Sequence, residues 1–180
     1  MNSEWFDRPG GEPVRLVEHD PSWAVQAADW MLRIKIAIGS AAASAEHIGS
    51  TAVPGLIAKP VLDLQIAVPD ISEESAYRSG LEALGLVLRQ RETDHLFFRP
   101  PAGKPRIVHV HVCELGSVWE REHVVFRDRL REDANAATAY ADLKQDLAKR
   151  VGNDRFAYAR GKAQFIKDVV DGKPLHGRSA

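Results

Sequence analysis

The stretch EHIGSTAVPGLIAKPVLDLQIAV, residues 46–68, contains the most informative pattern of this chain. From residue 62 to residue 68, apolar side chains alternate with a second set that includes Asp63 and Gln65, which is the period of a strand with one apolar face. The polar turn Gly49-Ser50 follows the end of another expected strand, and the segment VPGLIAKP, rich in helix and strand breakers, leads from one to the other. The stretch therefore predicts two strands, with a polar turn after the first and a single carboxylate near the start of the second.

Helices are expected on both sides of this stretch in the sequence. Asp20 and Pro21 open a helix with an apolar stripe at helical spacing, and Ser72 opens a second helix. The members of the stripe are Trp23, Ala27, Trp30, Ile34 and Ile38. The C-terminal third carries three further helical patterns, the first of them opened by a capping pattern at Ser117 and Glu120. The sequence thus predicts a helical N-terminal part and a helical C-terminal third around the strands.

Further strands complete the expected sheet. A short edge strand is expected over 14–17, and extended runs at 86–90, 95–99 and 106–113 are separated by polar or Pro/Gly-rich segments, as in an antiparallel meander. Runs of strands followed by runs of helices are typical of α+β folds. We therefore predict an α+β fold whose mixed or antiparallel sheet is covered by helices.

Length and composition limit the architecture and the setting. The 180 residues are enough for one substantial domain, which we expect over 14–173, between a loose N-terminal arm at 1–13 and a tail at 174–180. The single cysteine, Cys113, excludes an internal disulfide and indicates a reduced, cytoplasmic setting. No signal-peptide pattern or membrane-length apolar run is present, and a net charge of -1 indicates no nucleic-acid or membrane surface.

Three ionisable residues on expected strands are the leading candidates for chemistry. Asp63 is isolated in an apolar stretch, and a carboxylate there needs a partner, either a metal or a salt bridge to a basic side chain. His109 and His111 project from one strand face, and all three side chains would converge if the two strands were neighbours. The alternative for the histidines is a polar face open to water, and His47 could join the group as a fourth member.

A second set of residues could hold phosphate. Gly49, Ser50 and Thr51 offer unobstructed backbone N–H groups and two hydroxyls, although Gly-Ser is also a common turn pair. Basic residues and one tyrosine complete the set, namely Lys59, Arg99, Arg127, Lys144, Tyr158 and Lys162. Each basic side chain taken singly is typical of a solvated surface. As a set, they predict local contacts to the phosphate of a nucleotide or of another phosphorylated small molecule.

The order of these motifs resembles the GrpB family. The opening stretch is followed by HVHV, FRDRLR, YADLK and YARGK, and the resemblance extends over about residues 14–171. It implies the nucleotidyltransferase fold, in which carboxylates hold Mg²⁺ ions that bridge nucleotide phosphates. It also implies an association with coenzyme A or nucleotide metabolism, because the family occurs fused to dephospho-coenzyme A kinase.

The match to the nucleotidyltransferase signature is incomplete. Ile48-Gly49-Ser50 and Asp63 agree with it, but Gln65 stands where the family pattern has a second carboxylate, and histidines replace the carboxylate of a later strand. Imidazole ligands favour a transition metal such as Zn²⁺ over Mg²⁺. The resemblance therefore implies a nucleotide-binding protein with metal-dependent nucleotidyl transfer as its activity, catalysed at Asp63, His109 and His111. The alternatives are a degenerate nucleotide-binding or coenzyme A-related module and a metal-dependent phosphohydrolase.

Overall fold

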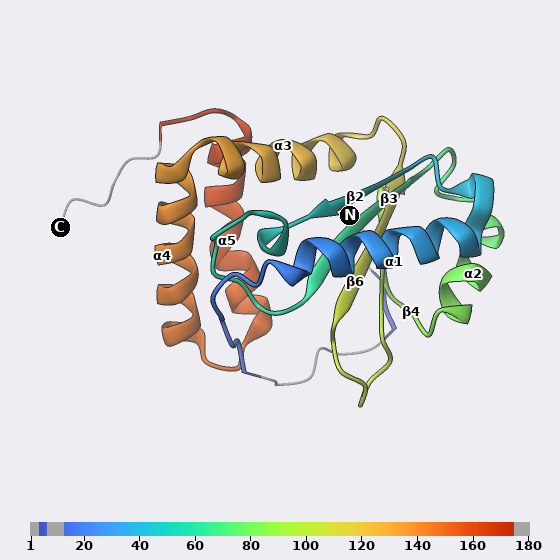
Figure 1. Ribbon diagram of the computed structural model, residues 1–180, viewed down its shortest axis with the longest axis horizontal. Helices are drawn as coiled ribbons and strands as arrows, with labels where there is room; N and C mark the ends of the chain where they lie inside the picture. The colour runs from blue at the N-terminus through green and yellow to red at the C-terminus, as the bar shows by residue number, and fades with distance from the viewer. Residues whose placement is uncertain (1–3, 7–12, 175–180) are drawn as a thin grey trace.

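A mixed β-sheet forms the centre of the molecule in the computed structural model, which describes residues 4–6 and 13–174 (Figure 1). Its strands are β1 (Glu4–Trp5), β2 (Ser44–Ile48), β3 (Leu62–Val68), β4 (Val87–Arg91), β5 (His95–Arg99) and β6 (Val108–Glu114). Their order in the sheet is β1-β4-β5-β6-β3-β2. The central pair β3 and β6 is parallel and the other pairs are antiparallel. The two strands that carry the candidate residues are therefore direct neighbours.

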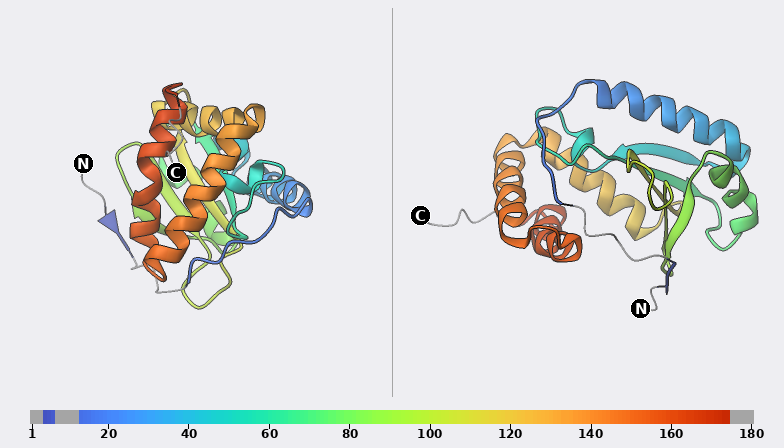
Figure 2. Two further views of the ribbon diagram at one scale, coloured as in Figure 1. Left: turned by 90° about the vertical axis from the view of Figure 1, so that its left-hand side faces the viewer. Right: turned by 90° about the horizontal axis from the view of Figure 1, so that it is seen from below.

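Helices lie on both sides of the sheet (Figure 2). They are α1 (Ser22–Ile38), α2 (Arg78–Ala83), α3 (Val118–Glu132), α4 (Ala134–Val151) and α5 (Arg155–Val170), with short 3-10 turns at Gly39–Ala41, Ser50–Ala52 and Glu74–Ala76. The first two helices pack on one face, whereas α3 runs along the other face and joins α4 and α5 in a helical group (Figure 2). The predicted α+β fold, with a mixed sheet covered by helices, is confirmed.

The main hydrophobic core lies between the sheet and the first two helices. Leu64 and Ile66 of β3 and Val110 of β6 are fully buried there, and the predicted stripe of α1 packs against them, with all its members buried except Trp30, which is partly buried. Asp20 helps to start α1, because its Oδ1 accepts a hydrogen bond from the Ser22 N–H at 2.8 Å. Side chains alternate along a strand, so the residues between these core positions face α3 instead.

A second core holds the three C-terminal helices against the connection between β2 and β3. Val53 and Leu56 of this connection pack with Phe126 and Tyr140. The approach of α5 to α4 is close, because a Cβ at Gly161 would lie 2.4 Å from a methyl group of Leu147. The loop that follows the Gly49-Ser50 turn is thereby brought against the helices that carry the candidate lysines.

Several details differ from the sequence-based expectations. The helix expected from Ser72 is shortened to α2, because Asp70 accepts hydrogen bonds from Ser72 and forms a turn there. The expected strand at 14–17 is wrong, since only Val17 forms a bridge, to Ala58. Within the predicted loose arm, Glu4–Trp5 pairs with β4 as a strand. Residues 1–3 and 7–12 of that arm, and 175–180 of the tail, lie outside the described residues.

Candidate functional site

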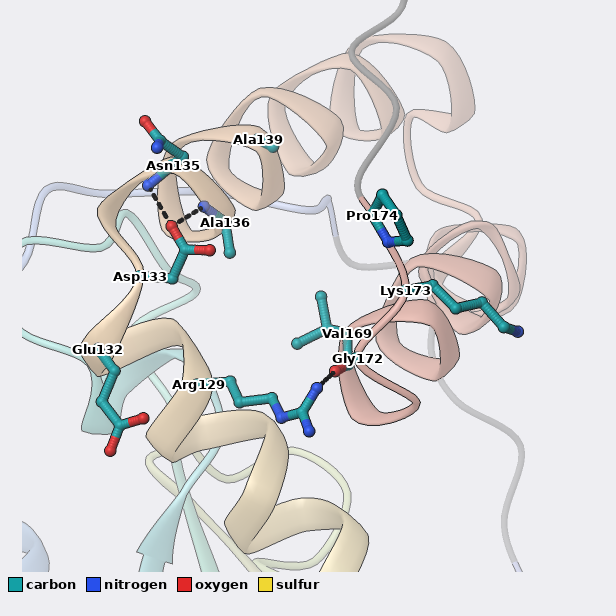
Figure 3. Close-up of a pocket in the computed structure, with 10 residues that line it drawn as sticks. All are labelled: Arg129, Glu132, Asp133, Asn135, Ala136, Ala139, Val169, Gly172, Lys173 and Pro174. Atoms are coloured by element: carbon teal, nitrogen blue, oxygen red, sulfur yellow. Dashed lines mark hydrogen bonds between the residues drawn. The ribbon is translucent and has the colours of Figure 1, made fainter.

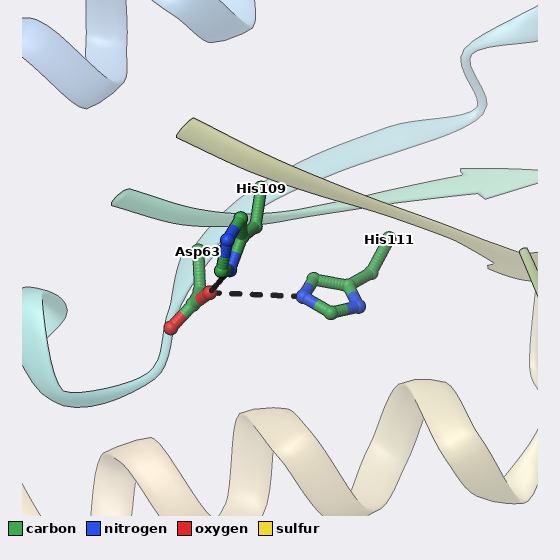
Figure 4. Close-up of side chains that lie close together, drawn as sticks. All are labelled: Asp63, His109 and His111. Atoms are coloured by element: carbon green, nitrogen blue, oxygen red, sulfur yellow. Dashed lines mark hydrogen bonds and ion pairs between the residues drawn. The ribbon is translucent and has the colours of Figure 1, made fainter. Parts of the chain in front are cut away.

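The parallel pairing of β3 and β6 brings the three ionisable candidates together (Figure 4). Asp63 lies opposite His109 in the register, and its Oδ1 is 3.0 Å from Nδ1 of His109 and 3.7 Å from Nε2 of His111. One ligand atom of each residue lies within 4.8 Å of the others. Two imidazole nitrogens and one carboxylate oxygen therefore converge on a space that could hold a single metal ion.

The protonation states of this group follow from its burial and its hydrogen bonds. Burial opposes ionisation of Asp63, but hydrogen bonds from His109 and His111 outweigh it and hold the Asp63 pKa well below its usual value. Burial lowers the pKa of His109, so its imidazole is neutral. Because a carboxylate only accepts, the Nδ1–H of His109 donates to it, and the buried Nε2 retains a lone pair with no hydrogen-bond partner in the described part of the chain. Nε2 is therefore the nitrogen of His109 that keeps an unused lone pair.

The Gly49 turn lies directly against the Asp63 carboxylate. Gly49 has a φ of +71°, in the region that side chains disfavour, and a Cβ there would lie 2.6 Å from Oδ2 of Asp63. The residue before it, Ile48, is paired with Asp63 across β2 and β3. Only glycine allows this close approach, so the polar turn and the carboxylate are built as one unit.

A cavity of about 60 Å³ adjoins this unit and is lined mainly by polar side chains. Its lining residues are Ser50, Thr51, Lys59, Val61, Asp63, His109, Lys144, Tyr158 and Lys162. Three ammonium groups thus converge from the β2–β3 connection, α4 and α5. Among the described residues, none of these lysines forms an ion pair with a carboxylate. The cavity therefore combines an excess of positive charge with hydroxyl groups, which is the chemistry of an anion site.

Lys144 is the most buried of the three lysines, with 2% of its surface exposed. Its Nζ donates hydrogen bonds to Ser50 Oγ at 3.1 Å and to the Ile57 carbonyl oxygen. Burial, and then the charges of Lys162 and Lys59, lower its pKa to about 7. The ammonium group is therefore fixed in place and readily gives up its proton while no anion is near.

The other two lysines share one aromatic ring. The Nζ atoms of Lys59 and Lys162 lie 5.5 and 4.8 Å from the centre of the Tyr158 ring. Burial is the largest cause that lowers the pKa of each, and for Lys59 the pKa falls to about 8. Tyr158 thus positions two positive charges at the cavity without neutralising them.

A cluster of rings that sequence reasoning missed surrounds His111. Nε2 of His95 is 2.8 Å from Nδ1 of His111, and the His95 ring stacks on Trp119 with centres 4.6 Å apart. Phe97 stacks on His111 at 5.1 Å, and His123 stacks on Trp119 at 3.7 Å. Burial lowers the pKa of His95 to about 2. The alternation of β5 and the i, i+4 spacing of Trp119 and His123 were the signals that could have revealed this cluster.

Three predicted site residues lie elsewhere. Arg127 links α3 to β2, because its guanidinium contacts Glu46 at 2.6 Å and the His47 carbonyl at 3.0 Å, as well as Asp128 of its own helix at 2.7 Å. Arg99 is buried at the end of β5 and donates to the Pro100 carbonyl at 3.1 Å. His47 does not join the Asp63 group, because its Nε2 forms a hydrogen bond with Thr51 Oγ1 at 3.0 Å.

A larger hollow of about 720 Å³ lies away from this site, between the α3–α4 turn and the end of α5 (Figure 3). Asp133 caps α4 there by accepting from the Asn135 and Ala136 N–H groups, and Arg129 donates to the Val169 carbonyl at 2.5 Å. Both side chains are thus hydrogen-bonded to backbone groups, and the described residues that line this hollow include no group that could hold a metal ion. In the part of the chain that the structure describes, no helix has the length and apolar character needed to span a membrane.

Comparisons with known proteins agree with the motif order. The family model described as GrpB protein matches residues 13–171. A UPF0157 protein of Streptomyces coelicolor is 40% identical over 158 residues, which cover 88% of this chain and 83% of the relative. The crystal structure of conserved protein GrpB from Enterococcus faecalis has a TM-score of 0.77 at 29% identity and covers 88% of this chain and 96% of that one. A dephospho-CoA kinase of Mycolicibacterium paratuberculosis is 29% identical, over 87% of this chain but only 45% of its own length.

Proposed function

The chain belongs to the GrpB family, and from this membership and the site geometry we propose that it binds a nucleotide or another phosphorylated small molecule. The observation that carries the proposal is the small cavity in which Lys59, Lys144 and Lys162 converge without carboxylate partners among the described residues. Buried charges without partners are unfavourable, so the three lysines keep their protons more readily when an anion compensates them. Phosphate suits this demand, since its oxygens accept from ammonium and hydroxyl groups at once.

The position of the cavity supports chemistry as well as binding. Asp63 and His109 line it, and with His111 they offer one oxygen and two nitrogens to a divalent metal. This donor set fits Zn²⁺ or a similar transition metal better than Mg²⁺, which prefers oxygen ligands only. When bound, such a metal would supply Lewis-acid stabilisation of the phosphate charge. The lysines would hold the phosphate next to it, and His109 would orient the carboxylate.

The substrate we propose within this class is a nucleotide or a coenzyme A precursor. The resemblance of the turn and of Asp63 to the nucleotidyltransferase signature favours metal-dependent nucleotidyl transfer. A relative bears the name dephospho-CoA kinase, although this chain matches less than half of its length. Both features point to a ligand that carries a phosphate on a nucleoside.

Isothermal titration of the full chain with a nucleotide panel and dephospho-coenzyme A, with and without Zn²⁺ or Mg²⁺, tests this proposal. We expect a member of the panel to bind the wild type, and Asp63→Asn to remove the metal-dependent part of the affinity. Lys149→Met, at an exposed position of the same helix as Lys144, serves as the control and should bind like the wild type. No binding by the wild type, or unchanged metal dependence after Asp63→Asn, would contradict the proposal.

One observation favours a second candidate, a binding module without transfer activity. Gln65 stands where the signature has a second metal-binding carboxylate, and it is fully buried with neither amide atom hydrogen-bonded within the described residues. A neutral amide cannot replace the charge of a carboxylate at a site that holds two metal ions. Product formation from any nucleoside triphosphate in a turnover screen would exclude this candidate, whereas tight binding without turnover would favour it.

A further inference from the structure

We propose that Lys144 is a site of reversible carbamylation, at which its amine adds dissolved carbon dioxide and gives a carbamate anion inside the lysine cavity. The inference goes beyond the proposed function, because it concerns a covalent change of the chain itself and not a bound ligand. Three observations carry it, namely the contacts of the Lys144 amine, the two neighbouring lysines and the small volume of the cavity.

Lys144 is held as a buried amine at the wall of the cavity. Only 2% of the residue is exposed, and no carboxylate among the described residues forms an ion pair with it. Burial without a counterion favours the neutral form of an amine, in agreement with a pKa of about 7. A neutral amine has two N–H groups, and Ser50 Oγ and the Ile57 carbonyl oxygen accept one each. Neither acceptor uses the lone pair, which makes Nζ a nucleophile.

The reaction needs only carbon dioxide as a second reactant. The lone pair of Nζ forms a bond to the carbon of carbon dioxide, one pair of C=O electrons moves to an oxygen, and the nitrogen releases one proton to water. Nothing is oxidised or reduced. The nitrogen can keep one N–H for the Ile57 carbonyl oxygen, and Ser50 keeps its hydrogen bond with Tyr140. The contacts that fix Lys144 are therefore compatible with the product.

The neighbouring lysines favour the carbamate, because the product carries a negative charge. Lys59 and Lys162 line the same cavity, with Nζ atoms 5.5 and 4.8 Å from the centre of the Tyr158 ring. Their amino groups can donate hydrogen bonds to the carbamate oxygens. The new anion in turn raises the pKa of each neighbouring lysine, so that each holds its proton more firmly. The carbamate and its neighbours thus stabilise one another, whichever charge each lysine carries beforehand.

The size of the cavity favours a small reactant. The cavity measures about 60 Å³, and one water molecule occupies about 30 Å³ in the liquid, so the carbon and two oxygens of a carboxylate group fit. A phosphate would need the same space, so the carbamate forms when the cavity holds no other anion. A lysine in water has a pKa of about 10.4 and is protonated at neutral pH, so it has no lone pair to react. The modification is therefore expected at the buried amine and not at exposed lysines.

Trapping of the carbamate as an ester tests this inference on the full chain. The wild type is equilibrated at pH 7.5 with ¹³C-labelled bicarbonate, which supplies labelled carbon dioxide, in a buffer free of amines and phosphate. Triethyloxonium ion then alkylates the carbamate, and peptide mass spectrometry locates the ethoxycarbonyl group. We expect this group on Lys144 with the labelled carbon in it, and at least tenfold less of it on any exposed lysine.

Two variants separate this site from general lysine chemistry. Lys162→Met removes a neighbouring amino group but leaves Lys144 in place, and it should lower the trapped fraction at Lys144 at least threefold. Lys149→Met, at an exposed position of the same helix, should give the same trapped fraction at Lys144 as the wild type. Lys59→Met replaces Lys162→Met if that variant does not fold, and the same decrease is expected.

Absence of the trapped group from Lys144 in the wild type, or an equal amount of it on exposed lysines, would overturn the inference. An unchanged trapped fraction in the folded Lys162→Met or Lys59→Met variant would overturn it as well. If the wild type binds nucleotides in the calorimetric panel but traps no carbamate, the proposed function stands and only this inference fails. If it traps the carbamate but binds no nucleotide, this inference stands and the proposed function fails.

Discussion

The two faces of the central sheet are built from the same two strands but have opposite chemistry. Toward α1 and α2, β3 presents apolar side chains from Leu62 to Val68 and β6 from Val108 to Val112, and these are almost completely buried. Toward α3, the alternate positions present Asp63, Gln65, His109 and His111. Burial of apolar surface stabilises the fold, whereas burial of ionisable groups opposes it. The apolar face therefore raises the free energy of unfolding, whereas the ionisable groups buried on the other face lower it and form the candidate site.

The two ends of the polar face differ in charge. Near Trp119, burial keeps the imidazoles of His95 and His123 neutral, so this end needs no counterion. Near Tyr158, three lysines are held together without carboxylate partners within the described residues, so this end has positive charge that an anion could compensate. The first arrangement suits the support of a metal ligand, and the second suits the capture of phosphate.

The largest expected effect is a loss of stability when a side chain of the apolar face is truncated. Leu64→Ala removes a fully buried side chain from the apolar face and should lower the free energy of unfolding by about 2–5 kcal/mol. Urea denaturation measures the loss, and titration of the folded variant with the nucleotide that the wild type binds should give an affinity within twofold of the wild type. A large loss of affinity with little loss of stability would show that the two faces are not independent.

The sequence predicted the strands of both faces because alternation is a local property. The period of β3 and β6 assigned Asp63, His109 and His111 to one side of their strands, and the motif order identified the family. Local sequence does not show that β3 and β6 are adjacent in the sheet, because more than thirty residues with other elements separate them in the chain.

The remaining site residues could not be assigned because their positions depend on tertiary packing. Lys144 and Lys162 reach the cavity only because α4 and α5 pack against the β2–β3 connection. Arg127 has the same helical signature as a phosphate-binding arginine, yet Glu46 and Asp128 hold it instead. Local sequence does not distinguish a lysine that meets a carboxylate from one that does not.

The next effect tests the contrast between the neutral end and the charged end of the polar face. The folded pKa of Lys144 is about 7, below its ordinary value of 10.5, so between these values the unfolded chain binds a proton that the folded protein does not. Stability should therefore rise with pH across this window and level off below about pH 7. Relative to Lys144→Met, the wild type should gain about 2 kcal/mol between pH 7 and pH 9. Denaturation at several pH values, without added phosphate, measures the difference, and parallel curves for the two proteins would contradict it.

The smallest effect tests whether the ring cluster supports the candidate metal ligands. If Nε2 of His111 offers its lone pair to a metal, its Nδ1 carries the proton, and His95 Nε2 at 2.8 Å must accept it. The other nitrogen of His95 then carries a proton and faces Glu92 Oε2 at 3.5 Å. His95→Phe keeps a ring to stack on Trp119 but removes the acceptor, and partners of this kind change metal affinity about tenfold or more.

We expect His95→Phe to lower Zn²⁺ affinity about tenfold in a competition titration with a chelator, with the free energy of unfolding changed by less than about 1 kcal/mol. His95→Gln, which retains an acceptor oxygen, should recover part of the affinity, and a merely structural role for His95 would not produce this recovery. Equal Zn²⁺ affinity in His95→Phe and the wild type would mean that His111 is oriented by its stacking with Phe97 and Trp119 alone. In that case the rings at the neutral end of the polar face would contribute packing only, and the candidate site would consist of Asp63, His109 and the lysine cavity.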